Sequence, residues 1–175
     1  MSEKLSPQEI AEQGKQSYQA GDLEAAIKSF AEAAAAYKDV GDDVMAAEMK
    51  NNQSVALLLD KKPEAALAVV VGTDLVFAGV ADHRRQGMAL TNQGTALETL
   101  KRFKEAIDCY VRAGDALKTA GEIDMRLQVM QLLSSLYLRR FKFIDAIIAL
   151  QAGLAEVKNP TPRQRLMKKL LFIRL

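Results

Sequence analysis

Few side chains of this sequence could carry out acid–base, nucleophilic or metal chemistry. The one histidine, His83, sits in the segment Asp82-His83-Arg84-Arg85, and the one cysteine, Cys109, follows 26 residues later. Metal sites need clustered ligands at fixed spacing, which this pair does not provide, and the glycine-rich phosphate motifs are missing as well. We therefore expect no enzyme activity, no cofactor and no metal. His83 is expected to be solvated or helix-capping, and Cys109 to be a small packed residue within a helix.

The composition is typical of a folded helical protein. Of the 175 residues, 49% are hydrophobic and 26% are charged, and Ala, Leu, Lys and Glu dominate, which favours helices. The amino-terminal segment lacks the basic and apolar pattern of a secretory signal. No stretch is long and apolar enough for a confident membrane span, and a single cysteine cannot form an intramolecular disulfide. We expect a cytoplasmic protein.

The net charge of +2 is unevenly distributed along the chain. Six of the 24 basic residues and none of the 22 acidic residues lie at or beyond Lys158, so residues 1–157 carry 18 basic and 22 acidic side chains, a net charge of −4. The body of the protein therefore gives no electrostatic reason to bind nucleic acid, and only the tail does.

An internal repeat of 40 residues determines the predicted architecture. Four segments align without a gap, and the same alanine recurs as Ala26, Ala66, Ala106 and Ala146. Four residues after it stands a larger apolar side chain, as Phe30, Val70, Tyr110 and Leu150, and twelve residues before it stands a small one, as Gly14, Ser54, Gly94 and Ser134. These columns predict helix pairs that cross closely at the small residues, with the larger side chains filling the space between hairpins.

Breaking or capping residues fall about every twenty residues and divide each repeat into two helices. The segments Ser6-Pro7-Gln8-Glu9 and Thr161-Pro162-Arg163-Gln164 are typical capping boxes with proline at the first helical position. We expect an extension over residues 1–6, four hairpins over about 7–40, 41–80, 81–120 and 121–158, and a basic amphipathic helix within 159–175. Since one hairpin cannot bury both of its faces, the repeats must stack.

This repeat resembles the tetratricopeptide repeat (TPR). The family motif is matched in the first repeat by Gly14, Gly21, Asp22, Ala26, Phe30 and Ala33, and in the third by Gly94, Phe103, Ala106, Tyr110 and Ala113. The second and fourth repeats match less well, with Thr73 and Gly153 at the last alanine position. Because the usual unit is about 34 residues, the unit here is similar to the longer 40-residue subclass, which is found in adaptor proteins that bind extended peptides. The resemblance implies an all-α, right-handed α-solenoid of four helix-turn-helix hairpins with a C-terminal capping helix.

The resemblance further implies a protein-binding scaffold in which the first helix of each hairpin lines a concave groove for an extended peptide or partner segment. The residues that map to this groove are Lys15, Tyr18, Gln19, Asn51, Asn52, Val55, Leu58, Met88, Asn92, Thr95, Glu98, Gln128, Gln131, Ser135, Leu138 and Arg139. Asn52 and Asn92 would stand one above the other, where carboxamides can pair with any extended backbone. An alternative role for them is contact between adjacent repeats. Binding of a C-terminal carboxylate is disfavoured, because Ala11, Met88 and Asn92 stand where that subtype has basic residues.

A self-associating structural module is the alternative function. The helix predicted from Glu64 to Ala81 is apolar nearly all round, interrupted by Thr73 and Asp74, and such a helix usually needs cover. Its outward column predicts a homodimer face made of Ala68, Gly72, Leu75 and Gly79.

The tail predicts an amphipathic helix whose apolar side consists of Leu166, Met167, Leu170, Leu171 and Ile173. Three roles are open for it: capping the last hairpin, self-association, and contact with an anionic membrane surface.

Overall fold

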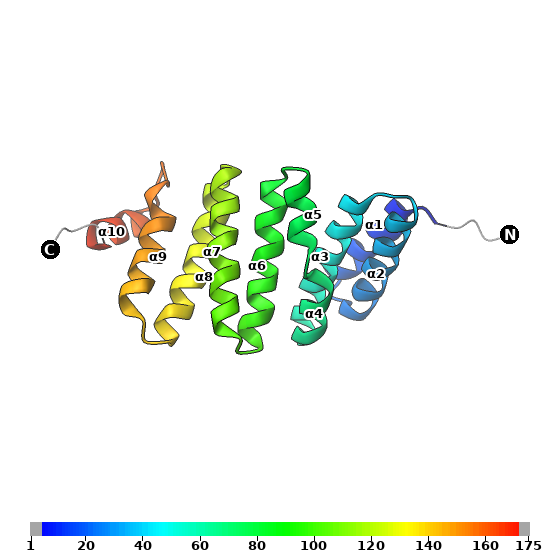
Figure 1. Ribbon diagram of the computed structural model, residues 1–175, viewed down its shortest axis with the longest axis horizontal. Helices are drawn as coiled ribbons and strands as arrows, with labels where there is room; N and C mark the ends of the chain where they lie inside the picture. Colours follow the sequence, from blue (N-terminus) through cyan, green and yellow to red (C-terminus); the bar gives the residue numbers. More distant parts are fainter. Residues whose placement is uncertain (1–4, 172–175) are drawn as a thin grey trace.

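The computed structural model describes residues 5–171, and over this range the chain forms ten helical segments and no strand. The segments are α1 (Pro7–Gln19), α2 (Leu23–Asp39), α3 (Asp43–Leu59), α4 (Pro63–Val70), α5 (Thr73–Gly79), α6 (His83–Thr99), α7 (Phe103–Thr119), α8 (Ile123–Arg139), α9 (Phe143–Ala155) and α10 (Pro162–Leu171). Consecutive hairpins stand side by side in one row, with α1 and α10 at opposite ends of the array (Figure 1). The predicted all-α solenoid of stacked hairpins is confirmed.

The turns between helices repeat as regularly as the helices. One residue with a left-handed backbone closes each turn, at positions 21, 41, 61, 81, 101, 121 and 141. Glycine occupies three of these positions, whereas Lys61, Ala81, Lys101 and Phe141 adopt φ values of 55–60° despite their side chains. Both predicted capping boxes are confirmed, since Glu9 N donates to Ser6 Oγ at 3.3 Å and Gln164 N to Thr161 Oγ1 at 3.3 Å.

The small-residue column lies at the helix crossing within each hairpin, as predicted. A Cβ atom added to Gly14 would lie 2.8 Å from the ring of Phe30, and one added to Gly94 would lie 2.7 Å from the ring of Tyr110. The two serines of this column donate hydrogen bonds instead: Ser54 Oγ to Ala66 O at 3.0 Å, and Ser134 Oγ to Ala146 O at 2.8 Å. The repeats with glycine in this column therefore carry an aromatic residue sixteen positions later, and the repeats with serine carry the smaller Val70 or Leu150 there.

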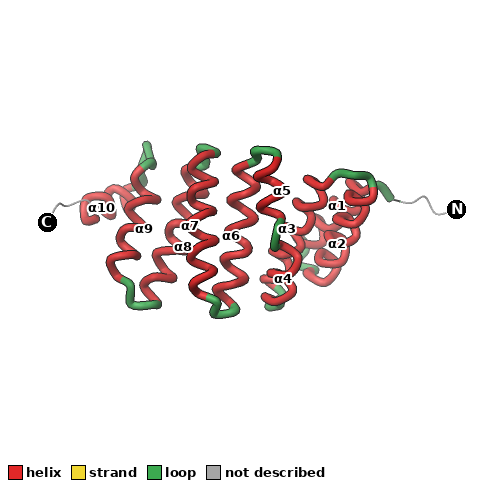
Figure 2. The backbone as a smooth tube through the Cα atoms, in the orientation of Figure 1, coloured by secondary structure: helices red, strands yellow, loops and turns green. Residues whose placement is uncertain are grey.

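The second hairpin departs from the prediction of one continuous helix from Glu64 to Ala81. The helix is interrupted at Val71–Gly72, where Gly72 has a φ of 85° (Figure 2). Thr73 and Asp74, the two polar residues of this segment, are buried. Thr73 Oγ1 donates to the freed carbonyl of Val70 at 2.8 Å, and the carboxylate of Asp74 accepts from Gln93 Nε2 at 2.9 Å and Arg112 Nη2 at 2.8 Å. A buried polar network replaces the helical hydrogen bonds at this break, because buried polar groups need partners.

The last helix, α10, covers part of the final hairpin. Met167 and Leu171 pack against the cluster of Leu127, Leu154 and Val157, and Lys168 Nζ donates to Val157 O at 2.9 Å. Leu166 and Leu170, which the sequence also assigned to the apolar side, are exposed, and Ile173 lies outside the described residues. Among the described helices, none has the length and apolar character needed to cross a membrane.

Candidate functional site

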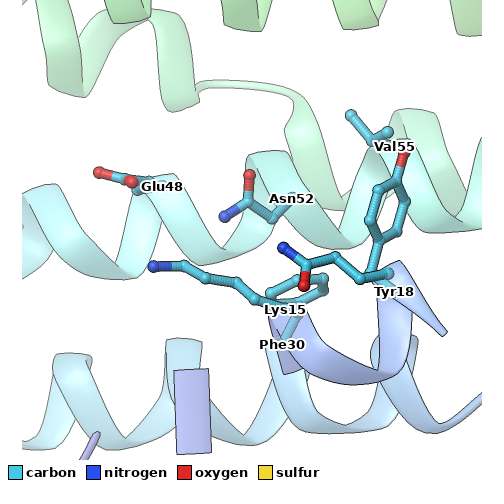
Figure 3. Close-up of a pocket in the computed structure, with 7 residues that line it drawn as sticks. Lys15, Tyr18, Phe30, Glu48, Asn52 and Val55 are labelled. Carbon is cyan, nitrogen blue, oxygen red and sulfur yellow. The ribbon is translucent and has the colours of Figure 1, made fainter. Parts of the chain in front are cut away.

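Three hollows lie along the first helices of the hairpins, where the sequence predicts a groove. The first has a volume of about 440 Å³ and separates α1 from α3. Its lining consists of Lys15, Tyr18, Gln19, Phe30, Glu48, Asn52 and Val55. The side chain of Lys15 extends along the gap between the two helices, with Asn52 opposite it on α3 (Figure 3). This hollow therefore presents a cation, an anion, amides and the rims of two aromatic rings.

The second hollow, of about 240 Å³, continues from the first because Asn52 and Val55 line both. It is bounded by side chains of α3, α6 and α8 and by one residue of α7, and most of them are apolar: Asn51, Met88, Thr91, Asn92, Leu117, Met125, Gln128, Val129 and Leu132. Such a lining suits an apolar side chain held by a few polar groups.

The third hollow, of about 470 Å³, lies at the far end of the row, between α8, α9 and α10. The hairpin contributes Gln131, Ser134, Ser135, Leu138 and Leu150, and the terminal helix contributes Thr161, Arg163, Gln164 and Met167. The terminal helix thus forms one wall of the row of hollows in addition to covering the last hairpin.

Twelve of the sixteen predicted groove residues line these hollows, and four do not. Leu58 packs into the core with Leu57 and Ala66. Thr95 Oγ1 lies 3.3 Å from the hydroxyl oxygen of Tyr110 on α7 and also donates to Thr91 O at 3.0 Å within α6. Glu98 and Arg139 form an ion pair that joins α6 to α8. These four residues hold the hairpins together.

The asparagines differ in whether their side chains are hydrogen-bonded within the described chain. Asn92 Nδ2 donates to Oδ1 of Asn51 at 2.7 Å, and Asn51 is only 4% exposed. This pair connects adjacent repeats, which is the alternative role that the sequence left open for Asn92. Asn52 lines both of the first two hollows and makes no side-chain hydrogen bond within the described chain. Its carboxamide is therefore the one that could pair with a bound backbone.

Sequence reasoning missed several lining residues. Glu48 could have been found, because it lies one helical turn before Asn52 on the same face of α3. Its carboxylate accepts from Arg85 Nη1 at 2.7 Å, which fixes α3 to α6. Arg163, Gln164 and Met167 carry no such signal, because only the path of the chain after α9 brings them to the hollow.

The side chains that could do chemistry have structural roles. His83 Nδ1 lies 3.1 Å from Gln86 Oε1 within α6, and Asp82, not His83, caps that helix. Burial raises the pKa of the Cys109 thiol, which lowers its reactivity at neutral pH. Burial also raises the pKa of Tyr110, whose hydroxyl donates to Glu98 Oε2 at 2.9 Å. Residues 5–171 contain no group of three His, Cys, Asp or Glu side chains placed to hold a metal ion.

The predicted homodimer face of the second repeat is interrupted. Ala68 lies on α4 and Leu75 and Gly79 lie on α5, and all three are exposed, but Gly72 lies in the break between the two segments. The four residues therefore do not form one unbroken helical column, and self-association through this face stays a prediction.

Comparison with known proteins supports the fold and leaves the family open. No family model matches the chain, and no curated protein matches it either. A solved structure described as a Podosopora anserina putative kinesin light chain with nearly identical TPR-like repeats is similar, with a TM-score of 0.74. The identity is 13%, over 98% of this chain and 86% of that one. The protein therefore shares the fold of a TPR-like helical-repeat solenoid.

Proposed function

We propose that this protein is a scaffold or adaptor that holds an extended segment of a partner protein along the first helices of its hairpins. The observation that carries the proposal is the row of hollows on α1, α3, α6 and α8, of which the first two share Asn52 and Val55. Folds of the TPR-like class generally mediate contacts between proteins. Separate hollows that follow one another suit successive side chains of an extended chain better than they suit one compact ligand.

The lining suggests what the partner segment contains. The shared wall of the first two hollows offers the amide of Asn52, which has donors and an acceptor for a peptide group. The second hollow is mostly apolar and takes an aliphatic or aromatic side chain. Lys15 and Glu48 lie across the first hollow from one another and favour a polar or charged neighbour in the partner. The proposed ligand is thus an extended peptide with an apolar anchor next to a polar residue.

Selection from a displayed library of random peptides tests this proposal. Peptides enriched on the wild-type chain are expected to lose binding to the Val55→Arg variant. Val55 lines both of the first two hollows, so the longer arginine side chain would occupy space that the peptide needs. Val40→Arg is the matched control, since Val40 is exposed at the end of α2, away from the hollows. Enrichment that survives Val55→Arg, or that is lost equally in Val40→Arg, would contradict the proposal.

A further inference from the structure

The helix α9 carries an unusual apolar surface at the end of the array opposite α1. Phe141, in the turn before the helix, is 81% exposed, and Ile144 is 74% exposed. Phe143, Ile147 and Ile148 are exposed as well, and the rings of Phe141 and Phe143 lie 6.4 Å apart, edge to face. Positions 143, 144, 147 and 148 share one side of a helix by their spacing. We call these five residues the α9 surface.

The other repeats show that this apolar character is specific to the last hairpin. At the position of Ile144 they carry Glu24, Glu64 and Lys104, and at the position of Ile148 they carry Lys28, Ala68 and Asp108. Five of these six residues are charged, as expected for an exposed helix face. In the last repeat, isoleucine at both positions puts apolar side chains where the other repeats mostly expose charged ones to water.

The α9 surface also continues the interface by which the repeats stack. Ile27 and Ile107, which occupy the position of Ile147 in other repeats, pack into the core clusters. Phe103, which occupies the position of Phe143, does the same. In the last repeat, α10 covers only the second half of α9, through Met167 and Leu171, and the first half stands uncovered at the end of the row (Figure 1). Within residues 5–171, Phe143 and Ile147 thus meet no following helix.

Basic side chains nearby are held elsewhere and do not cover this surface. The guanidinium of Arg140 lies over the ring of Phe103, 4.8 Å from its centre, and the ammonium of Lys142 lies 5.8 Å from the ring centre of Tyr137. Arg140 therefore contacts the third hairpin, whereas Lys142 stays against its own hairpin, where it also lies 3.9 Å from Asp145 Oδ2. The exposed apolar area of the five residues is roughly 600 Å², the upper end of what a monomer normally shows.

The opposite end of the array, at α1, is polar, and this argues against head-to-tail stacking of copies on the α9 surface. The exposed side chains of α1 include Gln8, Glu12, Gln13 and Gln16, which make a polar end face. Stacking of one copy's α9 on another copy's α1 would bury these polar groups against isoleucine and leave them without partners. Contact between two α9 surfaces buries apolar atoms on both sides and closes after two copies.

We propose that two copies of this chain associate tail to tail, with their α9 helices packed antiparallel across a twofold axis near Ile144 and Ile148. Two such surfaces bury roughly 1,200 Å² together, the lower limit for a specific stable interface. In this arrangement Phe141 of each copy faces the second half of the other copy's α9. A hollow of about 250 Å³ opens there between α7, α8 and α9. Its apolar walls, which include Val111, Met130 and Ala152, can receive an aromatic ring, and Asp115, Arg126 and Asp145 also line it.

This inference is independent of the proposed function, because no residue of α9 lines the first two hollows. Its consequence for binding is bivalence. A partner that carries two recognition segments would gain apparent affinity from a dimer without any new contact within either groove.

Sedimentation velocity and light scattering on the full chain test the proposal over a wide range of concentrations. The wild type is expected to reach 38.4 kDa, twice its 19.2 kDa monomer mass, and to stop there. The double variant Ile144→Lys/Ile148→Asp, which carries the residues of the third repeat at these positions, is expected to stay at the monomer mass with an unchanged helical circular dichroism spectrum. Leu75→Glu, on the exposed face of the second repeat, is the matched control and is expected to stay dimeric.

A second variant keeps the test independent of any folding defect. Phe141 has a left-handed backbone with a φ of 57°, which glycine adopts without strain. Phe141→Gly is therefore expected to raise the unfolding temperature of the monomer and at the same time to weaken the dimer, a combination that a merely structural role for Phe141 does not produce. A wild type that stays monomeric would overturn the proposal. So would masses that grow beyond the dimer, a folded Ile144→Lys/Ile148→Asp dimer, or a dimer lost only in Leu75→Glu.

Discussion

Replacing Gly94 by serine tests how the hairpins close. Serine stands at the matching position in the second and fourth repeats, where the residue sixteen positions later is Val70 or Leu150, whereas in the third repeat it is Tyr110. A Cβ at position 94 would lie 2.7 Å from Cε1 of Tyr110, whose ring is 1% exposed and held through its hydroxyl by Glu98. The ring has little room to move, so Gly94→Ser is expected to lower the free energy of unfolding by about 1–3 kcal/mol, the usual cost of overpacking.

The same change is expected to be nearly neutral or stabilising when Tyr110 is first replaced by valine. The pair Gly94→Ser/Tyr110→Val reproduces the pair of Ser54 and Val70, in which the serine hydroxyl donates to the alanine carbonyl at 3.0 Å. Serine also has a higher helix propensity than glycine, by about 0.5 kcal/mol. The two substitutions should therefore couple by about 2 kcal/mol, well above the roughly 0.5 kcal/mol within which independent sites add.

Urea unfolding followed by circular dichroism on the wild type, both single variants and the double variant measures this coupling, with equal m-values required for the comparison. Gly79→Ala is the control, because a Cβ there meets no atom within 4 Å and the change should be neutral or slightly stabilising. Free-energy changes that simply add for the two substitutions would refute the complementarity between the small residue and the ring.

Three further predictions concern the turns, the buried polar network and the thiol. Ala81→Gly should raise the free energy of unfolding by about 0.5–1 kcal/mol, because Ala81 has a φ of 55°. Gly121→Ala should lower the free energy of unfolding by about 1 kcal/mol for the same reason. Thermal melts that show the opposite signs would be inconsistent with this turn geometry. Arg112→Ala should destabilise the fold by about 1–3 kcal/mol, because it leaves the buried carboxylate of Asp74 without its cation. The loss should be smaller than for a fully buried ion pair, since Arg112 is 45% exposed. An unchanged urea midpoint would argue against a stabilising role for this ion pair. Alkylation of Cys109 by iodoacetamide should be slower in the folded chain than in urea at any pH near neutral, since the raised pKa of the thiol lowers its thiolate fraction; mass spectrometry giving equal rates would contradict the assignment.

Much of the fold could be predicted because the repeat imposes it. The 40-residue columns place the close crossings at Gly14 and Gly94, and the breakers place the turns. The interruption at Gly72 could not be predicted, because the segment around it looks like one apolar helix. What stabilises the break is a set of contacts from Gln93 and Arg112, which lie 19 and 38 residues from Asp74. A local pattern does not contain such distant partners.

Part of the lining of the candidate site could also be predicted from the repeat. Helical spacing on the first helices finds Lys15, Asn52 and Met88 as lining residues. It does not distinguish a side chain that faces solvent from one that bonds to the next repeat, as Asn51 and Glu98 do. It also gives no sign that α10 lines the third hollow, because that placement depends on the turn after α9.

Nuclear magnetic resonance of the methionine methyl groups tests the central claim most directly. Met88 and Met125 line the second hollow, whereas Met49 and Met130 are buried in the core and serve as internal controls. Titration with a peptide selected on the wild-type chain is predicted to shift the Met88 and Met125 methyl resonances and to leave those of Met49 and Met130 in place. Binding that leaves Met88 and Met125 unshifted would contradict a ligand site along the first helices.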